Sequence, residues 1–489
     1  MKHRKLRVLS LCLAAVLAGG VFAGCSGTEE PRETGTVPAV PTGEEQQEEE
    51  TAAPETELTD GLGTYDFGGR AFTVVTCSGF FFSPYDVEEE NGEVLNDAAF
   101  HRNLAMEERF GAKMVYQMLP GSFTEASDAI RNSVTAQDGA YSLGIVHPFG
   151  GLTGLISGAY VQDFGNIPHL DFEKPWWNQS FNKVLVIGDI LPAASNDFIY
   201  FNSGCLYFNK GILTVCGMDS PYAMVHDGTW TWDKLSVMAA AASSDLNGDG
   251  QWTEDDRYGY SIINNHRMIP VTYSYGLDAT ELGEDGYWNI SPIESEAMHD
   301  MAENYYKLLF ENQGTFLPTA NELDPFKNGN VLFLHYVTQN MVALRDVDFD
   351  FGILPMPKGS EEQKEYRSLA QSNVMVVPST TASEEDLDFT GVLIEALAYE
   401  SHAKVLPALY DTTCSYKYLR DEESVLMFDI IRASLVYDVI WNYTEGDDTA
   451  YFLSRLMGAQ STDTASFYAS HHKAVEKKLS GFFDSVKKG

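Results

Sequence analysis

The stretch DLNGDGQWTEDD, residues 245–256, has the residue types and spacing of a loop that wraps oxygen ligands around a metal ion. Gly250 stands at position six, where an EF-hand-like loop turns sharply. The oxygen donors occupy positions one, three, five, seven and twelve: Asp245, Asn247, Asp249, Gln251 (through its carbonyl) and Asp256. Carboxylate, amide and carbonyl oxygens suit Ca²⁺, so the sequence predicts a calcium site.

Two departures from a paired EF-hand indicate that this ion is structural. Position twelve is Asp256, whose side chain is shorter than the usual glutamate. The loop is solitary, and the residues after it, RYGYSII, read as a strand. A structural brace therefore fits better than a calcium sensor, and the alternative is an Asn-Gly-Asp-Gly turn that binds no ion.

The amino terminus, MKHRKLRVLSLCLAAVLAGGVFAGC, combines a basic start with an apolar run that ends in small residues before Cys25. This is the pattern of a secretory signal, and the run is too short for a spanning helix. Residues 22–25, FAGC, resemble a bacterial lipobox, which implies removal of residues 1–24 and lipidation of Cys25. The alternative is an ordinary cleaved signal with an incidental cysteine. Residues 25–60 are rich in Glu, Thr, Pro and Gly, which predicts a disordered acidic tether.

The chain carries 32 Lys and Arg against 71 Asp and Glu, a formal net charge of −39. Nucleic acid and anionic lipid surfaces are therefore poor partners, and we expect contact with the membrane only through the lipid anchor. No later run is long and apolar enough to cross a bilayer.

Four cysteines remain once the signal and the lipidated residue are set aside: Cys77, Cys205, Cys216 and Cys414. Their spacing matches neither a zinc site nor a CxxC redox motif. A disulfide between Cys205 and Cys216 and buried free thiols both stay open.

Strand and helix signals alternate at the start of the folded body. Residues 72–76 are a β-branched run, and LNDAAFHRNLAMEERFG reads as a helix that Asn96 or Asp97 caps and Gly111 ends. AKMVYQML and YSLGIVHPFGG contain two further strands, so the order predicts an α/β domain with a largely parallel sheet. Small ligands bind at the carboxyl ends of such strands. The candidate loop residues there are Phe80, Tyr85, His147 and Phe149, each of which could instead be a packed aromatic.

Four later motifs carry a family resemblance. They are CLYFNKGILTVCGMDSPYAMVHDGTWTWDKL, PFKNGNVLFLHY, DFDFGILPMPKG, and ALAYESHAKVLPALYD with YLRDEESVLMFDII. Together they resemble the extracellular solute-binding lipoproteins of ABC importers, family 1, whose best-known members bind sugars and oligosaccharides. The resemblance runs from about residue 65 to the 440s.

The resemblance implies an α/β fold of the two-lobed, type II periplasmic-binding-protein kind, with hinge crossings and a ligand cleft between the lobes. The expected lobes are 61–203 with 330–370, and 204–329 with 371–489. The chain would cross near 201–206, return near 330 and cross again near 368–373. Ligand groups are then expected at Asn202, Asn264, His335, Tyr336, Tyr437, Asp438 and Trp441. In the same layout, Trp176 and Trp177 are expected to pack. Trp230 and Trp232 flank an expected helix start and are also expected in the core.

The resemblance implies a monomeric, lipid-anchored bacterial receptor on the outer face of the cytoplasmic membrane. It would capture a carbohydrate and deliver it to the permease subunits of an ABC importer. No GxSxG, HExxH or P-loop spacing is present, so we do not expect an enzyme. Two alternatives stay open: a calcium-dependent surface scaffold that binds glycans, and a receptor for a non-sugar solute such as a peptide.

Overall fold

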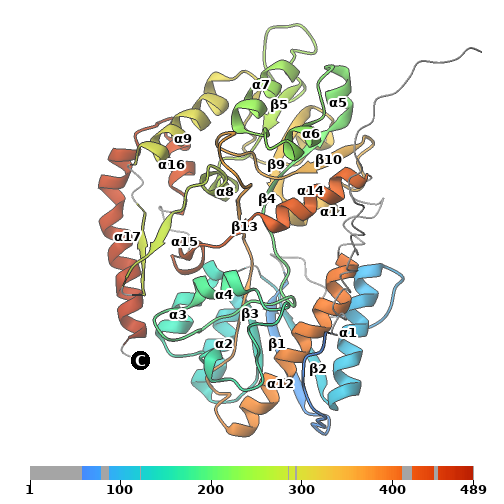
Figure 1. The fold of residues 1–489 in the computed structure, drawn as a ribbon, viewed down its shortest axis with the longest axis vertical. Coiled ribbons are helices and arrows are strands. Elements are labelled where there is room, and N and C mark those ends of the chain that lie inside the picture. The colour runs from blue at the N-terminus through green and yellow to red at the C-terminus, as the bar shows by residue number, and fades with distance from the viewer. Residues whose placement is uncertain are drawn as a thin grey trace, which may run out of the picture. The chain divides into compact units, whose positions relative to one another are not determined.

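The computed structural model has a mixed α/β architecture with two main open sheets and helices packed around them (Figure 1). It describes residues 58–487 except for 79–86, 122, 285, 292–294, 410–420 and 445–449. Two pairs of short strands complete the described sheets: β6 (Thr280–Leu282) with β7 (Trp288–Ile290), and β11 (Ser368–Leu369) with β13 (Leu435–Val436).

The first sheet has the strand order β12-β3-β1-β2. Its strands are β1 (Ala71–Cys77), β2 (Lys113–Leu119), β3 (Leu143–Val146) and β12 (Val374–Val376). The first three run parallel, as the sequence predicts, and β12 is antiparallel to β3. The helices around this sheet are α1 (Val94–Phe110), α2 (Glu125–Ala136), α3 (Leu152–Ser157), α4 (Gln179–Leu185) and α12 (Glu384–Glu400), which continues as the π-helical turn η6 (Ser401–Val405).

The two ends of helix α1 can be compared with the ends that the sequence predicts. It ends at Gly111, whose φ of 56° is left-handed and suits a residue without a Cβ. Its start differs from the prediction, because the helix begins at Val94. Asp97 therefore lies inside the first turn, where its carboxylate accepts hydrogen bonds from the backbone N–H groups of Asn91 and Gly92.

The second sheet has the order β10-β4-β9-β5-β8. Its strands are β4 (Gly204–Asn209), β5 (Tyr258–Ser261), β8 (Thr315–Phe316), β9 (Val331–Val337) and β10 (Phe351–Leu354). Helices and turns on this side are α5 (Lys210–Val215), α6 (Pro221–His226), α7 (Trp232–Ala242), η3 (His266–Met268), α8 (Ile269–Ser274), α9 (Glu296–Tyr306) with η4 (Lys307–Glu311), α10 (Asp324–Lys327), η5 (Thr338–Asn340), α11 (Met341–Leu344) and α14 (Glu422–Ala433). Further described helices are η1 (Pro148–Gly150), η2 (Phe164–Asn166), α15 (Val439–Tyr443), α16 (Phe452–Gly458) and α17 (Thr464–Val486).

Strand pairing groups the chain differently from the expected lobe bounds. Strands β9 and β10 lie in the second sheet with β4, although residues 330–370 were expected in the first lobe. Strand β12 pairs with β3 in the first sheet, although it follows residue 371. Segment 202–204 is bonded to both 338–339 and 370–371, so these three stretches lie together between the sheets.

The tryptophans expected to pack are buried. The indole N–H groups of Trp176 and Trp177 both donate to the buried Glu395, at 2.8 and 2.9 Å. Trp230 and Trp232 lie in the core of the second sheet. Cys205 is a buried free thiol and Cys216 is also free, so they form no disulfide.

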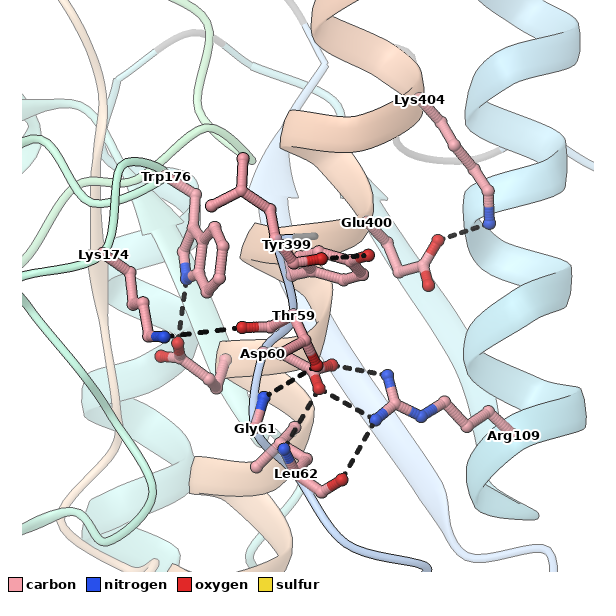
Figure 2. A network of polar contacts seen from close by, with 12 residues as sticks. Thr59, Asp60, Gly61, Leu62, Arg109, Lys174, Trp176, Tyr399, Glu400 and Lys404 are labelled. Atoms are coloured by element: carbon pink, nitrogen blue, oxygen red, sulfur yellow. Dashed lines mark hydrogen bonds and ion pairs between the residues drawn. The ribbon is translucent and has the colours of Figure 1, made fainter. Parts of the chain in front are cut away.

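The first described residues are fastened to the helices of the first sheet (Figure 2). Both oxygens of the Asp60 carboxylate accept hydrogen bonds from Arg109 on α1, at 2.5 and 2.9 Å. The Tyr399 hydroxyl on α12 donates to the Leu58 carbonyl, at 3.2 Å, and Lys174 reaches the Thr59 carbonyl. Residues 58–62 are thus held by elements of one sheet.

Candidate functional site

Aromatic rings gather where β3 ends. The Nδ1 atom of His147, the residue after β3, accepts a hydrogen bond from the Phe149 N–H at 3.0 Å. The His147 ring lies 4.7 Å from Phe123 and 5.3 Å from Phe149. Gly150 must be small, because a Cβ there would lie 1.8 Å from the Phe123 carbonyl oxygen. The rings therefore occupy the carboxyl end of a parallel strand, where the sequence predicts a ligand.

Helix α15 brings a tryptophan onto the same rings. The Trp441 ring centroid lies 4.3 Å from Phe149 and 6.0 Å from His147, and Tyr451 lies 6.5 Å from Phe149. Trp441 is buried, at 2% exposure. The sequence-predicted residues His147, Phe149 and Trp441 thus form one cluster, which we call the aromatic cluster.

Asp438 fixes the start of α15. Its Oδ1 accepts hydrogen bonds from the Ile440 N–H at 2.8 Å and the Thr280 hydroxyl at 2.9 Å. Its Oδ2 accepts from the Thr280 N–H at 3.2 Å. Asp438 was predicted to touch ligand, and the structure places it as a buried helix cap that holds α15 against β6.

The second sheet contributes polar groups beside this cluster. Arg267 pairs with Glu322 at 3.0 Å, and its guanidinium lies 4.2 Å from the centroid of the Tyr336 ring. The helix α8, which follows Arg267, places Ile269 and Tyr273 in one buried cluster with Trp441. Tyr336 was predicted from the sequence, whereas His266, Arg267 and Glu322 were not. Their signal was the position of His266 and Arg267 shortly after the strand GYS.

Burial controls the protonation of these groups. It lowers the pKa of His147 to about 3, with a smaller contribution from His266. It lowers the pKa of His266 to about 4, helped by Arg267. Burial raises the pKa of Asp438 to about 6, against the hydrogen bonds that it accepts. Both histidines are therefore neutral at pH 7.

Other predicted ligand residues have structural partners. The Asn202 side-chain oxygen accepts from the Gln339 N–H at 3.3 Å, between the sheets. His335 lies in the core of the second sheet, where its Nδ1 is 2.9 Å from the Tyr260 hydroxyl. The Asn264 side-chain amide forms a hydrogen bond with the Ser454 hydroxyl, at 2.9 Å.

Tyr437 is not part of the aromatic cluster and lies in a different pocket. Its ring stacks on Phe181 at 4.4 Å, its hydroxyl accepts from the Asn178 amide, and it lines a cavity of about 410 Å³ together with Arg432. Phe80 and Tyr85 lie outside the described residues.

The predicted calcium loop is a compact turn in which the carboxylates bind backbone N–H groups. Asp245 accepts from Gly248 and Gly250, each at 2.7 Å, and Asp249 accepts from Gln251. Both oxygens of the buried Asp256 accept backbone N–H groups as well. In the described ranges no three His, Cys, Asp or Glu side chains converge as a metal ion requires. The predicted donors also include the Asn247 amide and the Gln251 carbonyl, which suit Ca²⁺, and calcium here stays a prediction.

Comparisons with known proteins identify the fold. No family profile and no curated protein sequence matches the chain. Among solved structures, it is similar to the ABC substrate-binding protein Lmo0181 of Listeria monocytogenes in complex with cycloalternan, with 13% identity, a TM-score of 0.52, and coverage of 86% of this chain and 98% of that one. The GacH receptor of Streptomyces glaucescens, solved unliganded and with acarbose, matches at 15% identity and a TM-score of 0.56, covering 84% and 99%.

A third similar structure is the cyclic alpha-maltosyl-1,6-maltose binding protein of Arthrobacter globiformis, at 13% identity and a TM-score of 0.56, covering 86% and 100%. The fold is therefore the two-lobed fold of periplasmic sugar-binding proteins, as the sequence predicts. Across the described residues, no helix has the length and apolar character needed to cross a membrane.

Proposed function

We propose that this chain is the solute-binding receptor of an ABC importer and that it captures a sugar or oligosaccharide at the aromatic cluster. The observation that carries the proposal is the meeting of His147 and Phe149 with Trp441, at a strand end, in a fold shared with sugar receptors. Aromatic faces bind the C–H surfaces of sugar rings, and amides and neutral imidazoles bind the hydroxyl groups.

The receptor would act by differential affinity and would break no bond. Trp441 is buried in one cluster with Ile269 and Tyr273 of α8, so a ligand would reach it when the two halves of the molecule move apart. A ligand that contacts both halves favours their closure, and the closed form would dock on the permease. The lipid on Cys25 would keep the receptor at the outer face of the cytoplasmic membrane.

A thermal-shift screen of residues 26–489 tests this function. The probes are maltose, maltotetraose, tagatose and cycloalternan, with di- and tripeptides as a contrasting class. A ligand at a hundred times its Kd stabilises a protein by about 2.7 kcal/mol, which raises the Tm measurably. We expect a shift with at least one sugar. A shift with peptides alone would refute sugar binding, and no shift with any probe would refute the receptor function.

A further inference from the structure

Five buried side-chain atoms in two stretches have no hydrogen-bond partner among the residues that the structure describes. They are Gln371 Nε2, Ser372 Oγ and Asn373 Oδ1, between β11 and β12, and Trp441 Nε1 and Asn442 Oδ1, on α15. Buried polar groups are nearly always paired, because an unpaired one loses its hydration without compensation. Five such atoms in two short stretches indicate a partner from outside the chain.

The two stretches meet at His147. Strand β12 runs antiparallel to β3 with Val374 opposite Val146, so Asn373 lies one residue beyond this ladder, on the side of His147. The Trp441 ring is 6.0 Å from the His147 ring. The strands β11 and β13, which pair in parallel, end at Leu369 and Val436, shortly before the two stretches, and so bring them to the same region. Both stretches therefore border the aromatic cluster.

The five atoms are uncharged, and Asp438, the carboxylate at the start of α15, would repel an anion. Amide and indole N–H groups donate, amide oxygens accept, and the Ser372 hydroxyl does both. Burial keeps His147 and His266 neutral at pH 7. The charge of Arg267 is balanced by Glu322 at 3.0 Å, with both side chains mostly buried. A charged ligand would find no free counter-charge among these groups.

We propose that Gln371, Ser372 and Asn373, together with Trp441 and Asn442, form a hydrogen-bonding surface that selects a neutral sugar over an acidic or phosphorylated one. This inference rests on the proposed function and names the substrate class of the same site. Neutral hydroxyl groups satisfy all five atoms, because each hydroxyl can donate and accept. A carboxylate or phosphate would lose its hydration and gain only neutral partners. This unfavourable free energy would make an acidic or phosphorylated sugar bind more weakly than a neutral one.

Two variants separate ligand binding from structural roles. Ser372→Ala and Gln371→Met remove an unpaired polar atom and keep the approximate shape. We expect the Tm of the unliganded protein to stay unchanged or rise, while the Kd for the sugar rises at least tenfold. The matched control is Asn182→Leu, whose buried amide accepts from the Ser195 N–H at 2.8 Å and donates to the Ser195 carbonyl at 3.1 Å. That variant should lower the Tm and leave the Kd unchanged.

The affinity measurements use matched sugars on the chain without its signal: glucose against glucuronate and glucose 6-phosphate, and galactose against galacturonate. We expect the neutral member to bind at least tenfold more tightly in isothermal titration. If an acidic member binds as well or better, or if Ser372→Ala and Gln371→Met leave the Kd unchanged, the inference is wrong while the receptor function stands. If no sugar, neutral or charged, binds the wild type, both proposals fall.

Discussion

Glu395 allows a sharp test of how the first half of the molecule is held together. This carboxylate is fully buried on α12 and accepts hydrogen bonds from the indoles of Trp176 and Trp177 and from the Asp171 N–H. Glu395→Leu leaves both indole N–H groups without an acceptor. At about 2 kcal/mol for each hydrogen bond to a charged group, the free energy of unfolding should fall by about 4 kcal/mol. Glu395→Gln, which keeps one good acceptor, should lose roughly half as much.

Urea unfolding followed by tryptophan fluorescence measures these losses, since Trp176 and Trp177 report on their own surroundings. Glu385→Leu, exposed on the same helix, is the control and should stay within about 0.5 kcal/mol of wild type. A Glu395→Leu variant as stable as wild type would refute the reasoning. It would mean that the cost of burying the carboxylate equals the gain from its hydrogen bonds.

The pH dependence of the same residue gives an independent check. Burial raises the pKa of Glu395, against the two indole hydrogen bonds that lower it. The folded state therefore holds its proton to a higher pH than the unfolded chain does. The contribution of Glu395 to stability should fall as the pH rises from its ordinary pKa through the raised one. Glu395→Gln removes a titrating group, so its stability should lack this slope in the same urea titrations.

Four further predictions concern other parts of the chain. Burial lowers the pKa of His335 to about 3, so the unfolded chain takes up the proton at a higher pH than the folded protein does. The free energy of unfolding of the wild type should therefore fall by about 2 kcal/mol between pH 6.5 and pH 5. His335→Gln should lack this fall in urea unfolding at the same two pH values. Calcium should raise the Tm of the wild type and a chelator should reverse the rise, whereas the double variant Asp245→Asn, Asp249→Asn should not respond; equal Tm values with calcium and chelator would exclude the site. Trp441→Ala should weaken sugar binding at least tenfold in titration calorimetry, and an unchanged Kd would remove Trp441 from the site. Cys25→Ser should move the chain from the membrane to the soluble fraction and abolish palmitate labelling, and retained labelling would contradict lipidation there.

Local sequence was sufficient where a single element decides the outcome. The β-branched run at 72–76 forms β1, Gly111 ends α1, and the strand end at His147 meets Phe149 as expected. Each of these follows from periodicity or from backbone conformation within a few residues.

Sheet membership was beyond local sequence. The run VLFLHY is a buried strand in either sheet, and only its pairing with β4 and β5 assigns it to the second. Along such a strand successive side chains point to opposite faces, so His335 and Tyr336 could not both face one ligand. His335 lies in the core and Tyr336 lies against Arg267.

The polar atoms of 371–373 could not be found from sequence either. Gln, Ser and Asn in a linking segment read as solvent-exposed residues, and their burial depends on segments distant in the chain. Asn202 shows the opposite case. Its amide was predicted to bind ligand, but in the structure the amide oxygen accepts a hydrogen bond from the Gln339 N–H, where three stretches of the chain lie together between the sheets.

The fastening of residues 58–62 has a mechanical consequence. A pull on the chain from before residue 58 is borne by the Asp60–Arg109 ion pair and by α12, both on the side of the first sheet (Figure 2). Little of that load passes through the stretches between the sheets, so tension on the amino terminus would neither spread nor compress the two halves. The motion of the second half would thereby be isolated from a pull on the chain from before residue 58.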